Sequence, residues 1–368
     1  MSSNQPIMLS TMSTKKTAAI ILCSLWAVAG CNNNTVNAGQ RVIFSYPGLT
    51  PPDRLYDLTR EGKVGGIILF GENIGNNTAT VITDLHAAYE SSKCIDPASR
   101  LLIMTDQEGG QVRRLPDAGP FKSAKEMGQA EDPGAAAGRA GTEAAEALTP
   151  EGINTNLAPV VDVYREKGNF IDGPERSFGN ITSLVSTCAE AFILSQKGAG
   201  VVSAAKHFPG LGAAAAGSNT DLVSVTINLT LDELRSMDVA AYGSSIDAGV
   251  DMIMTSWALY PALDIDYPAG LSTKWVRGEL RDRLGYKGVI VTDALEAGSL
   301  TSYGATGKRA VLAAKAGVDL LLASGRDAKQ GEDVVEALVA ALSSGELAEE
   351  DFTAATNRIL TLRRKVKI

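Results

Sequence analysis

The chain has 368 residues, a formal net charge of −8 and a sequence pI near 5.0. This acidic balance, without a long basic run, excludes a surface built to neutralise a nucleic-acid backbone. Hydrophobic residues make up 45% of the chain, which is ordinary for a globular protein with a sizeable core. The roughly 330 residues that follow the N-terminal segment could form one large α/β barrel or two ordinary domains.

The N-terminus has the pattern of a targeting segment. Lys15 and Lys16 precede an uncharged apolar run, Thr17–Gly30, that ends in small residues. This run is too short to span a bilayer comfortably and is typical of a secretory signal peptide. We therefore expect residues 1–30 to be a signal peptide and 31–40 to be a short linker, with no transmembrane span in the mature chain.

Two secretion routes fit this segment. Val28–Cys31 resembles a bacterial lipobox, in which Cys31 would carry lipid, whereas four N-x-[ST] sequons suit a eukaryotic secreted glycoprotein. Beyond Cys31 the cysteines are Cys94 and Cys188, which either form one bridge or remain two buried thiols. The sequons are at Asn33, Asn76, Asn180 and Asn228.

Eight short apolar runs follow, and longer segments of helical period separate them. The runs are rich in Ile, Val, Leu and Met without strict polar alternation, which is typical of parallel strands buried on both faces. A capping box at Thr230–Glu233 opens one of the intervening helices. Eight such units predict a single-domain (β/α)8 TIM-type barrel over residues 41–368 rather than a doubly wound sheet. The runs are Arg41–Tyr46, Gly65–Phe70, Leu101–Asp106, Asn154–Val161, Gly200–Ala205, Asp251–Ser256, Gly288–Thr292 and Val318–Ala323.

Charged side chains gather where these runs end. In a TIM-type barrel the chemistry lies on the loops after the carboxyl ends of the strands. No glycine-rich nucleotide loop follows a run and no His/Cys/Asp cluster has metal spacing, so we predict no cofactor and no metal. The charged residues are Asp106 and Arg114 after the third run, Asp162 and Arg176 after the fourth, Lys206 and His207 after the fifth, and Asp293 after the seventh.

Each of these residues also has a purely structural interpretation. Asp106 and Asp293 could cap the helices that follow their strands, and Lys206 and His207 could be a buried ion pair or a core histidine. Their joint occurrence on successive strand ends favours a sugar site instead. Carboxylates and cations bind vicinal hydroxyls there, and a carboxylate can attack an anomeric carbon.

Five strings at these positions resemble glycoside hydrolase family 3, and most closely its single-barrel β-N-acetylglucosaminidase branch. The resemblance runs from about Gly39 to the C-terminus, and it leaves no room for the second α/β domain that family β-glucosidases usually carry. The most specific string is AKHFPG, which contains Lys206 and His207. The others are TDQEGGQVRRL, NTNLAPVVDV, YPALD and GVIVTDAL.

The resemblance implies a role for each matching residue. Asp293 would be the nucleophile of a retaining, two-step reaction, and we expect neighbouring Lys or Arg charges to depress its pKa. The other matching residues would hold the sugar beside that nucleophile. They are Asp106, Arg114, Arg176, Lys206 and His207.

The chain departs from the family pattern at the acid/base. In that branch an Asp-Ser-His motif follows the KHFPG string, with the Asp orienting a His that transfers protons. Here Gly217 replaces the Asp and Asn219 replaces the His, and neither can transfer a proton near neutral pH. Three explanations stay open: another acid such as Asp221, an enzyme slowed by the loss of general acid catalysis, or a protein that binds sugar without turnover.

The sequence thus predicts a secreted exo-β-N-acetylhexosaminidase acting on a β-linked carbohydrate. A β-glucosidase is the alternative within the same family, because the pocket for a 2-acetamido group is not readable from sequence. A transglycosylase or phosphorylase is a weaker alternative, since a phosphate acceptor would relieve the need for a general base.

Overall fold

The computed structural model describes Met1, Cys31 and residues 33–367, so the expected signal peptide falls outside the described residues apart from Met1. Eight parallel strands close into a barrel in the order β1-β2-β3-β6-β7-β8-β9-β10, and β10 pairs back with β1. The predicted TIM-type barrel is confirmed, and each apolar run supplies one strand. The strands are β1 (Val42–Phe44), β2 (Gly66–Ile68), β3 (Leu102–Thr105), β6 (Thr155–Asn156), β7 (Val202–Phe208), β8 (Met252–Thr255), β9 (Val289–Ala294) and β10 (Leu320–Leu322).

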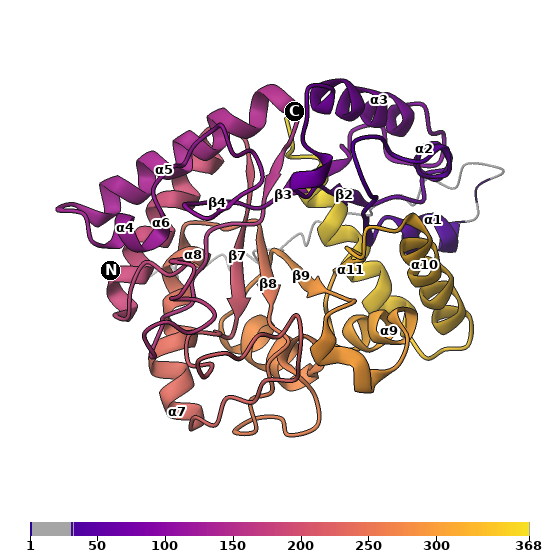
Figure 1. The fold of residues 1–368 in the computed structure, drawn as a ribbon. Coiled ribbons are helices and arrows are strands. Elements are labelled where there is room, and N and C mark those ends of the chain that lie inside the picture. Colours follow the sequence, from indigo (N-terminus) through magenta and orange to yellow (C-terminus); the bar gives the residue numbers. More distant parts are fainter. Residues whose placement is uncertain (2–30, 32, 368) are drawn as a thin grey trace.

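Helices surround the strands, with α5 and α6 on one side of the barrel and α9 and α10 on the other (Figure 1). A small hairpin of β4 (Gln107–Gly109) and β5 (Val112–Arg113) follows β3. The predicted capping box is present, because Thr230 and Glu233 each accept the other's backbone N–H at the start of α7. The α-helices are α1 (Asn33–Gly39), α2 (Asp53–Arg60), α3 (Thr78–Glu90), α4 (Ala124–Gly128), α5 (Pro133–Leu148), α6 (Thr182–Gly198), α7 (Leu231–Glu233), α8 (Tyr242–Asp247), α9 (Thr306–Ala316), α10 (Ala328–Ser343) and α11 (Glu349–Arg363), and the longest of the other helical segments are the π-helical η6 (Lys274–Arg283) and the 3₁₀-helical η7 (Gly298–Tyr303).

The barrel interior is a packed core of alternating side chains. Leu102 and Met104 of β3 belong to the same buried cluster as Met254 of β8, whereas Ile103 between them packs in the layer of strands and helices. This is the period of two that a strand imposes on its side chains. Ile359 of α11 joins the interior cluster, so this last helix closes the amino-terminal end of the barrel. In a barrel of this type the chemistry is expected at the opposite, carboxyl-terminal mouth.

The N-terminal segment differs from its expected form. Residues 33–39, expected within a linker, form α1, and Cys31 just before it is joined to Cys94 by a disulfide. Cys188 is a free, buried thiol, as one of the two alternatives had it, but Cys94 is neither bridged to Cys188 nor free, so both alternatives were wrong for Cys94. The disulfide engages the same sulfur that an acyl anchor on Cys31 would need. Among the residues that the structure describes, no helix is long and apolar enough to cross a membrane.

Candidate active site

A cavity of about 390 Å³ opens at the carboxyl-terminal mouth of the barrel. Its floor is apolar and consists of interior residues such as Leu157, Met254 and Leu322. Two larger hollows, of about 630 and 520 Å³, lie at the other end beside α11 and contain none of the predicted site residues. The mouth cavity contains all of them: Asp106, Arg114, Arg176, Lys206, His207, Asp221 and Asp293.

Strand alternation explains why three of these residues face the cavity. Asp106, Lys206 and Asp293 each stand two positions beyond an interior-facing residue, namely Met104, Ala204 and Val291. Since side chains two apart on a strand share a face, each charged group continues the interior row of its own strand. The strands thus deliver one cation and two carboxylates to the top of the packed core.

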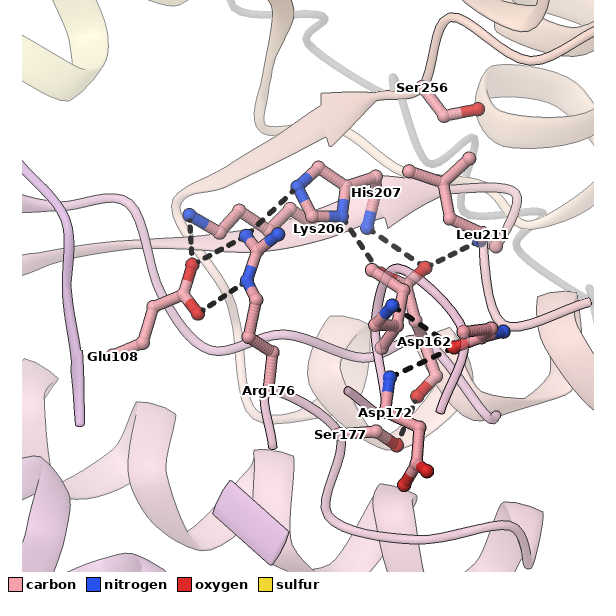
Figure 2. A network of polar contacts seen from close by, with 12 residues as sticks. Glu108, Asp162, Asp172, Arg176, Ser177, Lys206, His207, Leu211 and Ser256 are labelled. Atoms are coloured by element: carbon pink, nitrogen blue, oxygen red, sulfur yellow. Dashed lines mark hydrogen bonds and ion pairs between the residues drawn. The ribbon is translucent and has the colours of Figure 1, made fainter. Parts of the chain in front are cut away.

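A buried ionic network holds the cations in place. Lys206 Nζ lies 2.7 Å from both Asp106 Oδ1 and Glu108 Oε1. Arg176 donates to both oxygens of Glu108, from Nε at 2.9 Å and from Nη2 at 2.7 Å, and Figure 2 shows Glu108 facing both cations. Arg114 Nη2 lies 3.3 Å from Asp106 Oδ2. Lys206 is therefore both a buried, ion-paired residue and part of the cavity wall.

These charges fix the protonation states of the network. Burial raises the pKa of Glu108, but the Arg176 and Lys206 charges outweigh it and lower that pKa to about 2. For Asp106 burial is likewise outweighed, by Lys206 and Arg114, and its pKa falls well below the usual range. Burial lowers the pKa of Lys206, yet the two carboxylates raise it overall. Both acids are ionised and the lysine is charged, which suits charge-assisted hydrogen bonds to hydroxyls.

His207 is oriented by Asp162 from below the cavity. Its Nδ1 lies 2.8 Å from Asp162 Oδ2, and Asp162 Oδ1 accepts the backbone N–H of Leu211 at 2.7 Å (Figure 2). The other ring nitrogen faces Arg176 Nη2 at 3.5 Å. Because Asp162 is fully buried and holds both the ring and the loop after it, His207 keeps one orientation.

Asp293 lies at the end of β9, where its Oδ1 accepts the backbone N–H of Ala294 at 2.7 Å. Burial raises its pKa, His207 and Lys206 lower it, and Asp221 raises it, with a net rise above the ordinary value. The expectation that neighbouring cations would depress this pKa is therefore wrong in its net direction. Burial of the carboxylate is the largest cause, and it outweighs the lowering by the neighbouring charges.

Asp221 reaches the cavity from the loop after β7. The residue is exposed, yet it lines the same cavity as Asp293, and its charge acts on Asp293. Gly217 and Asn219 are not among the residues of the cavity wall. The positions that replace the family's acid/base motif thus do not line the cavity, whereas Asp221 of the same loop does.

Sequence reasoning missed Glu108 as a site residue. It stands two positions after Asp106, so its alternation with Asp106 was the available signal. It also missed the rim residues Phe70, Glu296 and Arg326, which come from three different loops and share no motif. Among the described residues, no group of three or more His, Cys, Asp or Glu side chains could hold a metal ion, and the absence of a cofactor stays a prediction.

Comparison with known proteins identifies the family. Residues 45–362 match the Glycosyl hydrolase family 3 N terminal domain. The chain is 56% identical to an uncharacterized secreted glycosyl hydrolase of Arthroderma benhamiae, over 90% of this chain and 93% of that protein. It is 30% identical to a β-hexosaminidase of Xanthomonas oryzae pv. oryzae, over 83% of this chain and 92% of that protein.

A solved structure agrees with these relatives. The glycoside hydrolase family 3 β-N-acetylglucosaminidase from a Paenibacillus species superposes with a TM-score of 0.84 at 33% identity, over 90% of this chain and 62% of that one. The similar length of the Xanthomonas relative supports the single-barrel branch that the sequence resembles. The chain belongs to glycoside hydrolase family 3 and is a glycosidase of O-glycosyl bonds.

Proposed function

We propose that the protein is an exo-acting, retaining β-N-acetylhexosaminidase with Asp293 as nucleophile. The observation that carries the proposal is the single cavity in which Asp293 faces a ring of paired cations and carboxylates above a closed apolar floor. A sugar chain cannot pass through that floor, so the substrate must enter by one end. The names of the hexosaminidase and N-acetylglucosaminidase relatives support the N-acetyl specificity.

In this proposal five side chains bind the hydroxyls of the sugar beside the scissile bond, namely those of Asp106, Arg114, Arg176, Lys206 and His207. Their ion pairs hold donors and acceptors in fixed positions before substrate arrives, which lowers the reorganisation needed in the transition state. The half-buried, ionised Asp106 accepts hydrogen bonds from hydroxyls, and the cations donate them.

Asp221 would act as the acid/base. In the first step its carboxyl proton passes to the glycosidic oxygen while an Asp293 oxygen attacks the anomeric carbon and the bond to the leaving group breaks. In the second step the Asp221 carboxylate takes a proton from water, whose oxygen attacks the same carbon and releases Asp293. The support for this role is that Asp221 and Asp293 line one cavity and their charges interact.

We further propose that the protein is secreted without a lipid anchor. The disulfide at Cys31 suits an oxidising compartment and engages the thiol that an anchor would use. The Arthroderma relative carries the word secreted in its name. The acceptor asparagines of all four sequons are exposed, as glycosylation requires.

The decisive experiment compares wild type, Asp293→Ala and Asp221→Ala on 4-nitrophenyl β-N-acetylglucosaminide and β-glucoside, with Glu90→Gln on the exposed side of α3 as control. We expect turnover of the N-acetylglucosaminide, loss of it in Asp293→Ala, and a fluorinated slow substrate that labels Asp293 by mass spectrometry. For Asp221→Ala we expect a roughly 10²–10⁴-fold loss on poor leaving groups and rescue by azide.

Other outcomes would redirect the assignment. Preference for the glucoside would indicate a β-glucosidase, and a label on another residue would refute the nucleophile. Sugar binding without any turnover in wild type would refute the enzyme and leave a sugar-binding protein. Faster turnover with added phosphate, with a glycosyl phosphate as product, would indicate a phosphorylase.

A further inference from the structure

The residues around Asp221 form a tight turn that Asn219 holds together. Asn219 Oδ1 accepts the backbone N–H of Asp221 at 2.8 Å, and the Asn219 carbonyl accepts the N–H of Leu222 at 3.1 Å. An asparagine oxygen that bonds the backbone two residues further on makes an Asx turn. The Asn219 side chain therefore sets the direction in which the Asp221 side chain leaves the backbone.

A second anchor comes from the loop that carries the nucleophile. Gly298, five residues after Asp293, donates its N–H to the carbonyl of Asp221 at 2.8 Å, and Ser299 donates to the carbonyl of Thr220 at 3.2 Å. A Cβ atom at position 298 would lie 2.2 Å from the Leu222 carbonyl oxygen. The two backbones approach so closely that only glycine fits.

We propose that Asn219 and Gly298 are positioning residues that aim the Asp221 carboxylate into the cavity opposite Asp293. The inference rests on the proposed function, in which Asp221 is the acid/base. The backbone hydrogen bonds from Gly298 and Ser299 join the loop of Asp221 directly to the loop of Asp293. They therefore fix the distance between the two carboxylates. Position 219, which holds the proton-transferring histidine in the pattern that the sequence resembles, here holds an amide that orients a carboxylate two residues away.

The geometry predicts a defined kinetic signature. A displaced acid cannot protonate the leaving group, and a misplacement of about 1 Å lowers the rate by roughly 10²-fold. The loss should be large for leaving groups that need protonation and small for those that depart unaided. A merely structural role for Asn219 would instead lower the rates of all substrates together.

The test uses the full chain and a series of aryl β-N-acetylglucosaminides from 4-methylphenyl to 2,4-dinitrophenyl. We expect Asn219→Ala and Gly298→Ala to lower kcat/KM for the 4-methylphenyl substrate by roughly 10- to 100-fold while the 2,4-dinitrophenyl substrate changes less than about threefold. Asn219→Asp keeps an acceptor oxygen and should retain activity. Its added negative charge should move the alkaline limb of the pH profile to higher pH. Ser218→Ala, at the residue just before this turn, is the matched control and should behave as wild type.

Three results would overturn the inference. If Asp221→Ala shows the leaving-group dependence and Asn219→Ala and Gly298→Ala do not, Asp221 is the acid but needs neither residue. If Asp221→Ala itself shows no such dependence, the acid/base assignment fails and the positioning role fails with it. Equal losses on all substrates with an unchanged pH profile would indicate a structural role only.

Discussion

Replacing Glu108 by Gln tests the ionic network at its centre. Glu108 is 6% exposed and is the shared partner of Lys206 and Arg176, which are held by three contacts of 2.7 to 2.9 Å. Glutamine keeps the shape of the side chain but removes its charge, and its amide presents N–H groups toward two cations. Lys206 would then keep its contact with Asp106, whereas Arg176 would lose both of its contacts to a carboxylate.

The expected loss of stability follows from the ionisation of Glu108. Burial alone would raise its pKa, and the Arg176 and Lys206 charges bring it down to about 2 from its ordinary value of 4.5. Neutral Gln resembles the protonated acid, so this difference corresponds to about 3 kcal/mol of unfolding free energy at pH 7. Removal of one partner from a buried ion pair costs about 3–5 kcal/mol in general, which agrees. For a chain of this size the melting temperature should fall by roughly 4 °C.

The pH dependence of the stability difference between wild type and Glu108→Gln is a sharper test of the ionic network. A carboxylate whose folded pKa is depressed stabilises the fold above its unfolded pKa, and this contribution is lost as pH falls through the folded pKa. The difference between wild type and Glu108→Gln should therefore shrink to roughly 2 kcal/mol at pH 3.5. Urea unfolding of both proteins at pH 7 and pH 3.5 measures it, with Glu90→Gln as a surface control. A difference below about 1 kcal/mol at pH 7, or one that grows as pH falls, would refute the network as described.

Three further predictions concern other parts of the molecule. Cys94→Ser opens the loop that the bridge to Cys31 closes over a separation of 63 residues, and urea unfolding should show a loss of roughly 4 kcal/mol; an unchanged midpoint would mean that the bridge constrains little. Burial is the main cause of the raised pKa of Asp293, and the Asp221 charge raises it further. Asp221→Asn removes that charge, so the acidic limb of kcat/KM for a 2,4-dinitrophenyl glycoside should move to lower pH. An unmoved limb would contradict the coupling between the two carboxylates. Protein from a eukaryotic secretory host should lose mass on enzymatic deglycosylation, with one step removed by each Asn→Gln change at the exposed sequons; unchanged mass would refute glycosylation at Asn33, Asn76, Asn180 and Asn228.

Much of the barrel could be predicted from local patterns. Eight apolar runs of strand length, separated by helical segments, were enough to predict the fold, because a strand buried on both faces must be apolar throughout. The predicted site residues also share one cavity, since a parallel barrel collects the carboxyl ends of all its strands at one mouth. The spacing of two residues that puts Asp106 on the same strand face as Met104, and Asp293 on the same face as Val291, can be read from the sequence alone.

Other features depend on contacts between distant segments and have no local signature. The pairing of Cys31 with Cys94 required the folded positions of α1 and the segment after α3. The net rise in the pKa of Asp293 required the folded burial of its carboxylate, which outweighs the nearby His207 and Lys206 charges, together with the approach of Asp221.

The proposed acid/base residue shows most clearly what the sequence alone does not predict. The chain sequence shows that a histidine is missing at position 219 and that Asp221 is the nearest acid, but it does not say where that acid points. The tertiary structure decides this, because the β7 loop crosses to the β9 loop and Gly298 binds the Asp221 carbonyl there. Periodicity is encoded residue by residue, whereas the meeting of two loops 77 positions apart exists only once the barrel has closed and brought their strands together.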